Sequence, residues 1–299
     1  MKDINYKHSI IFFNFCILIS PIYLVFNNEL IIYCLFLILI IGISHGSLDN
    51  IKGKKLLKLF GYNSIYFFYL IYLTISLLII ILWLIFPNTV LLLFLIVASY
   101  HFGKEDTVFS FKRKFFITEC LFFFKGSSVI IAPLLFQRDS TNEIFKTLNF
   151  YVFEAPIFND YFLIIFLSLG LLSSIYLSSE KKVDIKALMF MDFFSLIILN
   201  FFLTPILAFT IYFCFLHSIR HSIHLIFELD NSFKLGLKKF IRKALPLTFV
   251  TGLTFLIAIF FLNNFYKLDE AIYKVIFIGL ASLTFPHILL EYLLEKNEK

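Results

Sequence analysis

The chain has 299 residues, of which 60% are hydrophobic and only 15% are charged, and its mean hydropathy is +0.91. Soluble domains are on average about 45–50% apolar and about 25% charged. The composition therefore excludes a soluble globular enzyme, a disordered chain and a nucleic-acid-binding protein, and it predicts a protein that crosses a membrane many times.

Apolar runs recur along the whole chain, and most approach the roughly 20 residues that a helix needs to cross a bilayer. In chain order we count ten of them, at 9–27, 29–48, 63–86, 88–104, 115–136, 160–178, 186–204, 205–228, 246–264 and 270–294. No segment between them is long and polar enough to form a soluble domain. The sequence thus predicts one transmembrane domain over 1–299, an all-α polytopic helical bundle with about ten (eight to ten) transmembrane helices.

The basic residues give the predicted orientation. When successive loops are assigned to alternate sides of the membrane, 20 of the 26 Lys and Arg residues fall on one side. Cytoplasmic loops carry such an excess of Lys and Arg. We therefore expect both termini in the cytoplasm, and the net charge of +6 needs no nucleic-acid partner.

Six of the seven histidines lie on or near predicted spans, and the predicted orientation puts all six towards the cytoplasmic side. His45 ends the second run, His101 ends the fourth, and His287 lies in the last, whereas the eighth run carries His217, His221 and His224. Ionisable groups inside a membrane are costly and are functional candidates by default. Four different predicted helices therefore deliver histidine to one leaflet.

The spacing within the eighth run favours a metal site. His217 and His221 are four residues apart, so a helix places both imidazoles on one face, and His224 continues that stripe. His45 and His101 would complete a set of four nitrogen ligands. Imidazole suits iron, copper, zinc and nickel, so ligand type leaves the metal open. The four cysteines lie in apolar runs without CxxC spacing, so we expect neither a disulfide framework nor a zinc–thiolate site.

Carboxylates accompany the histidines along the chain. Asp49 follows His45 by four residues, Asp106 follows His101 by five, and Glu291 follows His287 by four. Each is a candidate acceptor for the second ring N–H of its histidine, an interaction that fixes the ring and raises its basicity. Arg220, within the eighth run, is a candidate to neutralise one of these acids.

Other interpretations of the histidines stay open at this point. Each imidazole alone is explained by a helix–helix hydrogen bond. A di-iron hydroxylase or desaturase needs about eight or more histidines with adjacent pairs, whereas this chain has seven and no such pair. A haem electron carrier and a non-catalytic transporter with a structural histidine cluster are further alternatives.

Four motifs in order carry a family resemblance. The segments are GISHGSLD at 42–49, YHFGKED at 100–106, HSIRH at 217–221 and FPH at 285–287. Together they resemble the hallmarks of the Brp/Blh family of bacterial and archaeal beta-carotene 15,15'-dioxygenases, over about 40–290. Ser44 and Ser47 depart from the family pattern, where proline and alanine are expected, but His45 between them is retained.

The resemblance implies an iron-dependent integral membrane enzyme. It would cleave the central double bond of beta-carotene with O2 and release two molecules of all-trans-retinal. The family's Fe(2+) ligands match His45, His101, His217 and His221. His287 matches the family's Pro-His segment, and the resemblance assigns it no specific role. His224 lies outside the motifs, and we expect it either to support the metal site from outside the ligand set or to be structural. A non-catalytic accessory protein in retinal formation is the alternative within the family.

The chemistry implied by the resemblance agrees with a membrane protein. Beta-carotene is a hydrocarbon that resides in the bilayer, so we expect a cell inner membrane location and an apolar tunnel for the polyene. Tyr100, Phe102, Tyr212 and Phe213 are candidates to line that tunnel and to stabilise positive charge on the polyene. The product implies a functional link to a retinal-binding rhodopsin.

Overall fold

The computed structural model describes the chain except for residues 1, 27–29, 63, 108–115, 180 and 298–299, and it also leaves out the side chains of 2–3, 24–26 and 45. The described part is helical and contains no strand. Its elements are α1 (Lys2–Phe26), α2 (Ile31–Leu37), η1 (Ile38–Gly42), η2 (Ile43–Leu48), α3 (Asp49–Leu59), α4 (Ile65–Ile85), α5 (Pro87–Glu105), α6 (Phe116–Phe136), α7 (Arg138–Thr147), η3 (Val152–Glu154), η4 (Pro156–Phe158), α8 (Asp160–Ser178), α9 (Val183–Phe202), α10 (Pro205–Ile211), η5 (Tyr212–Ser218), α11 (Ile219–Leu229), α12 (Phe233–Leu262) and α13 (Leu268–Asn297).

The predicted all-α membrane bundle is confirmed. Within the residues that the structure describes, each of the ten apolar runs falls on helical segments, and eight helical stretches are long and apolar enough to cross a membrane. The two predicted spans outside those eight correspond to α1 and α5. In α5, polar residues occupy both ends, from Asn88 to His101 and Lys104, which lowers the mean hydropathy of the helix.

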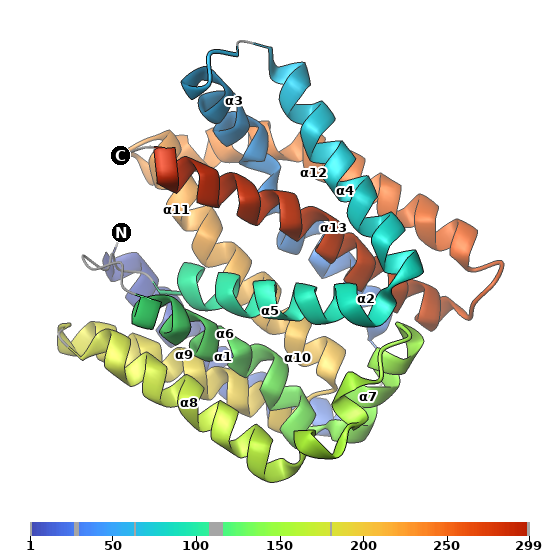
Figure 1. The fold of residues 1–299 in the computed structure, drawn as a ribbon. Helices are drawn as coiled ribbons and strands as arrows, with labels where there is room; N and C mark the ends of the chain where they lie inside the picture. The colour runs from blue at the N-terminus through green and yellow to red at the C-terminus, as the bar shows by residue number, and fades with distance from the viewer. Residues whose placement is uncertain (1, 27–29, 63, 108–115, 180, 298–299) are drawn as a thin grey trace.

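The helices form two groups (Figure 1). On one side α1 packs against α9 and α6 packs against α8, and on the other α13 packs against α3, α4 and α12. In Figure 1, α5 and the α10–α11 stretch run between the two groups, and the N and C labels lie on the same side of the bundle.

Two of the membrane stretches depart from α-helical geometry close to the histidines. The stretch Ile31–Leu59 passes through a π segment, η1, and then a 3-10 segment, η2, which contains the backbone of His45. The stretch Pro205–Leu229 contains the π segment η5, which includes His217. Such π insertions shift the register of the following side chains and are frequent at functional sites. The predicted periodicity did not anticipate either segment.

Close contact between α5 and α6 sets the position of His101. A Cβ atom added to Gly103 would lie 1.7 Å from the carbonyl oxygen of Phe122, and one added to Gly126 would lie 1.8 Å from the carbonyl oxygen of Ser99. Both glycines are therefore required for this approach of the two backbones. Because Gly103 is two residues after His101, the same contact fixes where α5 presents that imidazole.

Candidate metal centre and cavity

Four buried imidazoles from four elements meet between the two helix groups. His101 on α5 lies 5.3 Å, between ring centroids, from His217 on η5 and 5.3 Å from His287 on α13. His221 on α11 lies 6.1 Å from His287. All four side chains are buried. The structure therefore brings together three of the predicted ligands, and His287 lies among them.

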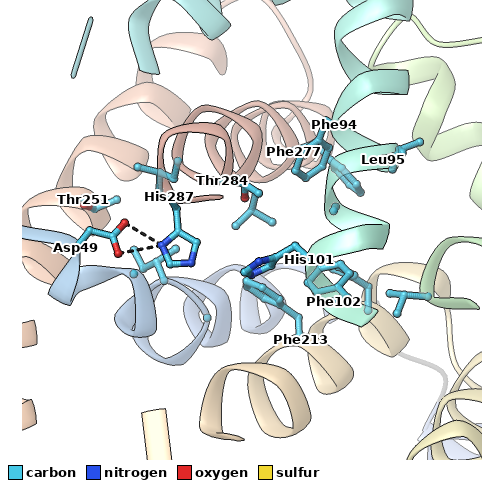
Figure 2. A pocket seen from close by; sticks show the side chains of 18 of the residues that line it. Asp49, Phe94, Leu95, His101, Phe102, Phe213, Thr251, Phe277, Thr284 and His287 are labelled. Atoms are coloured by element: carbon cyan, nitrogen blue, oxygen red, sulfur yellow. Dashed lines mark hydrogen bonds and ion pairs between the residues drawn. The ribbon is translucent and has the colours of Figure 1, made fainter. Parts of the chain in front are cut away.

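A carboxylate holds Nδ1 of three of these imidazoles. His217 donates to Oδ1 of Asp106 at 3.0 Å, and His221 donates to Oε2 of Glu105 at 3.1 Å. His287 donates to Asp49, with both carboxylate oxygens at 2.9 Å. Figure 2 shows this last contact, with the other ring nitrogen of His287 on the side of His101. These bonds assign Nε2 as the nitrogen that each ring offers to a metal.

Two of these carboxylates have partners that local spacing does not indicate. Asp106 binds His217 rather than His101, and Asp49 binds His287, which lies 238 positions later in the chain. Glu291 pairs with Lys52 across α13 and α3 rather than with His287. The reason is geometric, because facing helices bring His217 and His287 next to acids from distant segments of the chain.

Glu105 is a site residue that the sequence reasoning missed. It lies next to Asp106, at the end of α5, and its carboxylate binds His221 from another helix. The available signal was the pair of adjacent acids that closes the apolar run after His101.

Arg220 does not neutralise Asp49 or Asp106 directly. Its guanidinium binds both carboxylate oxygens of Asp192 on α9, at 2.6 and 3.0 Å, and donates to Ser9 on α1 at 2.7 Å. Arg220 and Asp192 are both buried. This buried pair anchors the histidine-bearing helix α11 to the group that contains α1 and α9.

Two further predicted residues differ in their placement. His224 lies away from the cluster, with a side chain that is 55% exposed and pairs with Glu228 one turn later. Seven residues of helix advance His224 roughly 10 Å along the axis from His217, which carries it beyond the cluster. The side chain of His45 lies outside the described residues, but its backbone belongs to η2. Two other residues of η2, Ile43 and Gly46, line the cavity described next.

A largely apolar cavity of about 360 Å³ lies against His101 and His287. Figure 2 shows Asp49 and Thr251 at one end of the labelled lining and Phe94, Leu95 and Phe277 at the other. Its wall comes from many elements: Gly42, Ile43, Gly46, Ser47, Asp49, Asn50, Phe68, Tyr69, Tyr72, Leu73, Phe94, Leu95, Ala98, His101, Phe102, Val129, Ile130, Pro133, Thr141, Ile144, Phe145, Pro205, Ile206, Phe209, Phe213, Leu247, Val250, Thr251, Phe277, Leu280, Leu283, Thr284 and His287. Hydrocarbon side chains thus form a compartment that ends on imidazole rings.

The aromatic residues expected along the tunnel divide into two pairs. Phe102 and Phe213 line the cavity, and both rings pack on His217, with centroids 4.8 and 5.8 Å away. Tyr212 instead donates its hydroxyl hydrogen to Asp106 at 2.5 Å, behind the imidazoles. Tyr100 donates to Glu119 on α6 at 2.5 Å. The hydroxyl groups explain this division, because each needs a polar partner inside the bundle.

The donor set fits a non-haem iron ion by its chemistry. Neutral imidazoles suit iron, and carboxylates on their second nitrogens fix the tautomer and orientation. Among the described side chains, no group of three or more His, Cys, Asp and Glu residues meets the spacing of a metal site. The described side chains do not include that of His45, the remaining predicted ligand. The four cysteines are free thiols, and none belongs to the cluster.

Comparison with known proteins agrees with this arrangement. The family model described as beta-carotene 15,15'-dioxygenase matches residues 36–295, which include every imidazole of the cluster. The chain belongs to this family. The beta-carotene 15,15'-dioxygenase of an uncultured marine bacterium, 66A03, is 30% identical over 271 residues, covering 87% of this chain and 93% of that protein. No solved structure matches the chain.

Membership of the beta-carotene 15,15'-dioxygenase family confirms the resemblance found in the four motifs, and it identifies the chain as an enzyme. The matched region begins at Phe36, before the π segment η1, and ends at Glu295, near the end of α13. It therefore includes the cavity and the imidazoles beside it, while all of α1 lies before it.

Proposed function

We propose that this protein cleaves the central 15,15' double bond of beta-carotene with O2 and releases two molecules of all-trans-retinal. One observation carries the proposal: an apolar cavity ends on a cluster of buried imidazoles supported by carboxylates, in a chain of the beta-carotene 15,15'-dioxygenase family. A hydrocarbon substrate needs the apolar wall, and oxygen chemistry needs the metal ligands.

We assign Fe(2+) as the cofactor. His101, His217, His221 and His287 would hold it through Nε2, together with His45, the ligand expected from the family motif. When bound, ferrous iron supplies the activation of dioxygen for scission of the double bond. Asp106, Glu105 and Asp49 would fix the tautomer and orientation of the rings, because each accepts the Nδ1 hydrogen of one imidazole.

The cavity wall would position the polyene and exclude water. Phe102 and Phe213 line the cavity and pack on His217, so they would contact the chain of double bonds nearest the metal. Aromatic faces stabilise positive charge. The apolar side chains farther from the imidazoles, among them Phe94 and Phe277, would hold the remainder of the hydrocarbon and fix which bond is presented.

We further propose that the enzyme works in the cytoplasmic membrane with both termini in the cytoplasm. The distribution of Lys and Arg supports this orientation. Retinal released into the bilayer would be available to a retinal-binding rhodopsin, which gives a functional rather than a structural link between the two proteins.

The test is expression in a bacterium that accumulates beta-carotene, followed by chromatography of the extracted pigments. We expect the carotene to disappear and retinal to form with the intact chain, and carotene to persist with His217→Ala. The metal content of both purified proteins is measured in parallel. An iron-loaded, membrane-inserted chain that leaves carotene intact contradicts the proposed reaction and favours the accessory role.

A further inference from the structure

Two residues at the cavity wall are also exposed at the surface of the protein. Leu73 is 65% exposed and Val250 is 58% exposed, whereas the other residues that line the cavity in the described part of the chain are buried or half-buried. A side chain that belongs both to the cavity wall and to the outer surface marks the mouth of that cavity. Leu73 and Val250 therefore locate the mouth.

The mouth lies between α4 and α12. On α4, Phe68, Tyr69 and Tyr72 continue the cavity wall next to Leu73, and on α12, Leu247 and Thr251 do so next to Val250. α4 packs on α3, α5 and α13, while α12 packs on α11, η2 and α13. The two helices thus form opposite sides of the opening.

The depth of the mouth along both helices is the same. Leu73 precedes the end of α4 at Ile85 by twelve residues, and Val250 precedes the end of α12 at Leu262 by twelve residues. At a rise of 1.5 Å per residue, each lies about 18 Å from the end of its helix. The hydrocarbon core of a bilayer is about 30 Å thick. The opening therefore faces lipid chains rather than water.

The surface around the mouth has the composition of a lipid-facing wall. On α4, Leu70 and Leu77 are 63% and 58% exposed, and on α12, Phe249 and Leu253 are 69% and 48% exposed. Both helices are among the eight apolar enough to cross a membrane. A hydrocarbon in the bilayer would thus meet mainly apolar side chains on its way to the opening.

We propose that the gap between α4 and α12, bounded by Leu73 and Val250, is a lateral portal through which beta-carotene passes from the bilayer core into the cavity. The inference rests on the proposed function for the identity of the substrate. A lateral path keeps the polyene out of water throughout, so no hydration of the hydrocarbon opposes entry. The path ends at Tyr72, whose hydroxyl donates to Asp49 at 3.0 Å, next to His287.

The portal is tested by narrowing it with tryptophan. Leu73→Trp and Val250→Trp place an indole at the mouth, and Leu70→Trp and Leu253→Trp are matched controls on the same helices, at exposed leucines that do not line the cavity. The full chain is reconstituted in phosphatidylcholine vesicles and mixed, without oxygen, with vesicles containing beta-carotene. The rate at which carotene enters the protein is followed by quenching of protein fluorescence.

We expect carotene uptake to slow about tenfold or more in the two portal variants. Overpacking typically costs about 1–3 kcal/mol, and about 1.4 kcal/mol added to the barrier for entry slows it tenfold. With oxygen present, KM for carotene should rise while the iron content stays that of the unmodified protein. Uptake at the unmodified rate in both portal variants, or equal slowing in the controls, would overturn the proposal.

A reversible block separates closure of the portal from a folding defect. In a Cys120→Ser background the other native cysteines are buried, so Leu73→Cys is the thiol open to a bulky methanethiosulfonate reagent. Labelling should stop uptake and reduction should restore it, whereas Leu70→Cys should be unaffected. Uptake that continues through labelled Leu73→Cys contradicts the portal. If labelling blocks uptake reversibly but the protein forms no retinal in air, the portal is supported and the proposed cleavage reaction is rejected.

Discussion

Asp49 and His287 are 238 positions apart in the chain and are joined by a carboxylate–imidazole contact of 2.9 Å. The contact links the start of α3 to the middle of α13, and the hydroxyl of Tyr72 on α4 donates to the same carboxylate at 3.0 Å. Asp49 is thus the point at which three elements around the cavity meet. It holds His287 in the orientation in which Nε2 faces the cluster.

Replacing Asp49 with asparagine should weaken metal binding without removing a ligand. The amide carries no charge to support the imidazole, and loss of such contacts typically lowers metal affinity about 10–100-fold. Affinity is measured by titrating the purified protein with Fe(2+) under anaerobic conditions. Glu291→Gln is the control, because Glu291 pairs with Lys52 rather than with a histidine. Equal affinities for Asp49→Asn and the intact protein would contradict this assignment.

Alanine at the cluster histidines should reduce iron content, in contrast to alanine at His224. His101, His217, His221 and His287 are buried together, whereas His224 is exposed and pairs with Glu228. We expect each cluster variant to lose most of its iron and His224→Ala to keep it, as measured by elemental analysis. His45→Ala and His287→Ala belong to the same series, and retained iron in either one removes that residue from the ligand set.

Gly103→Ala should destabilise the bundle and disturb the metal site together. Its Cβ would lie 1.7 Å from the carbonyl oxygen of Phe122, so α5 and α6 must separate, at a cost of roughly 1–3 kcal/mol or more. We expect a lower unfolding temperature in detergent and a lower iron content. Gly252→Ala on α12 is the matched control, since its added Cβ meets open space and alanine favours a helix by about 0.5–1 kcal/mol. A Gly103→Ala protein as stable as this control would show that the two backbones do not need to be so close.

Arg220→Met should destabilise the protein more than the double variant Arg220→Met with Asp192→Leu. Removing one partner leaves a buried charge, which typically costs about 3–5 kcal/mol, whereas replacing both by apolar groups is often close to neutral. Thermal unfolding of the two variants measures the difference. Arg220→Lys should recover only part of the stability, because lysine cannot bind both oxygens of Asp192 as the guanidinium does. Equal stability of the single and double variants would mean that Asp192 is compensated by another group.

The sequence was sufficient for the fold class and for most of the candidate ligands. Runs of about 20 apolar residues and the one-sided distribution of Lys and Arg define a helical membrane bundle, because the bilayer permits few other structures. The same patterns place His101, His217, His221 and His287 towards one side of the predicted membrane bundle. The structure brings these four rings together. The membrane itself supplies this information, since it restricts where a polar residue can lie.

Only the tertiary structure decided which groups face one another. Spacing along the chain indicated His101 as the partner of Asp106, but the structure pairs Asp106 with His217 on η5, and it joins Asp49 to His287 on α13. The exposed rim at Leu73 and Val250 likewise depends on how α4 and α12 are placed around the cavity. Contacts between helices follow from side-chain packing across the whole bundle, and no local pattern in a single sequence records them.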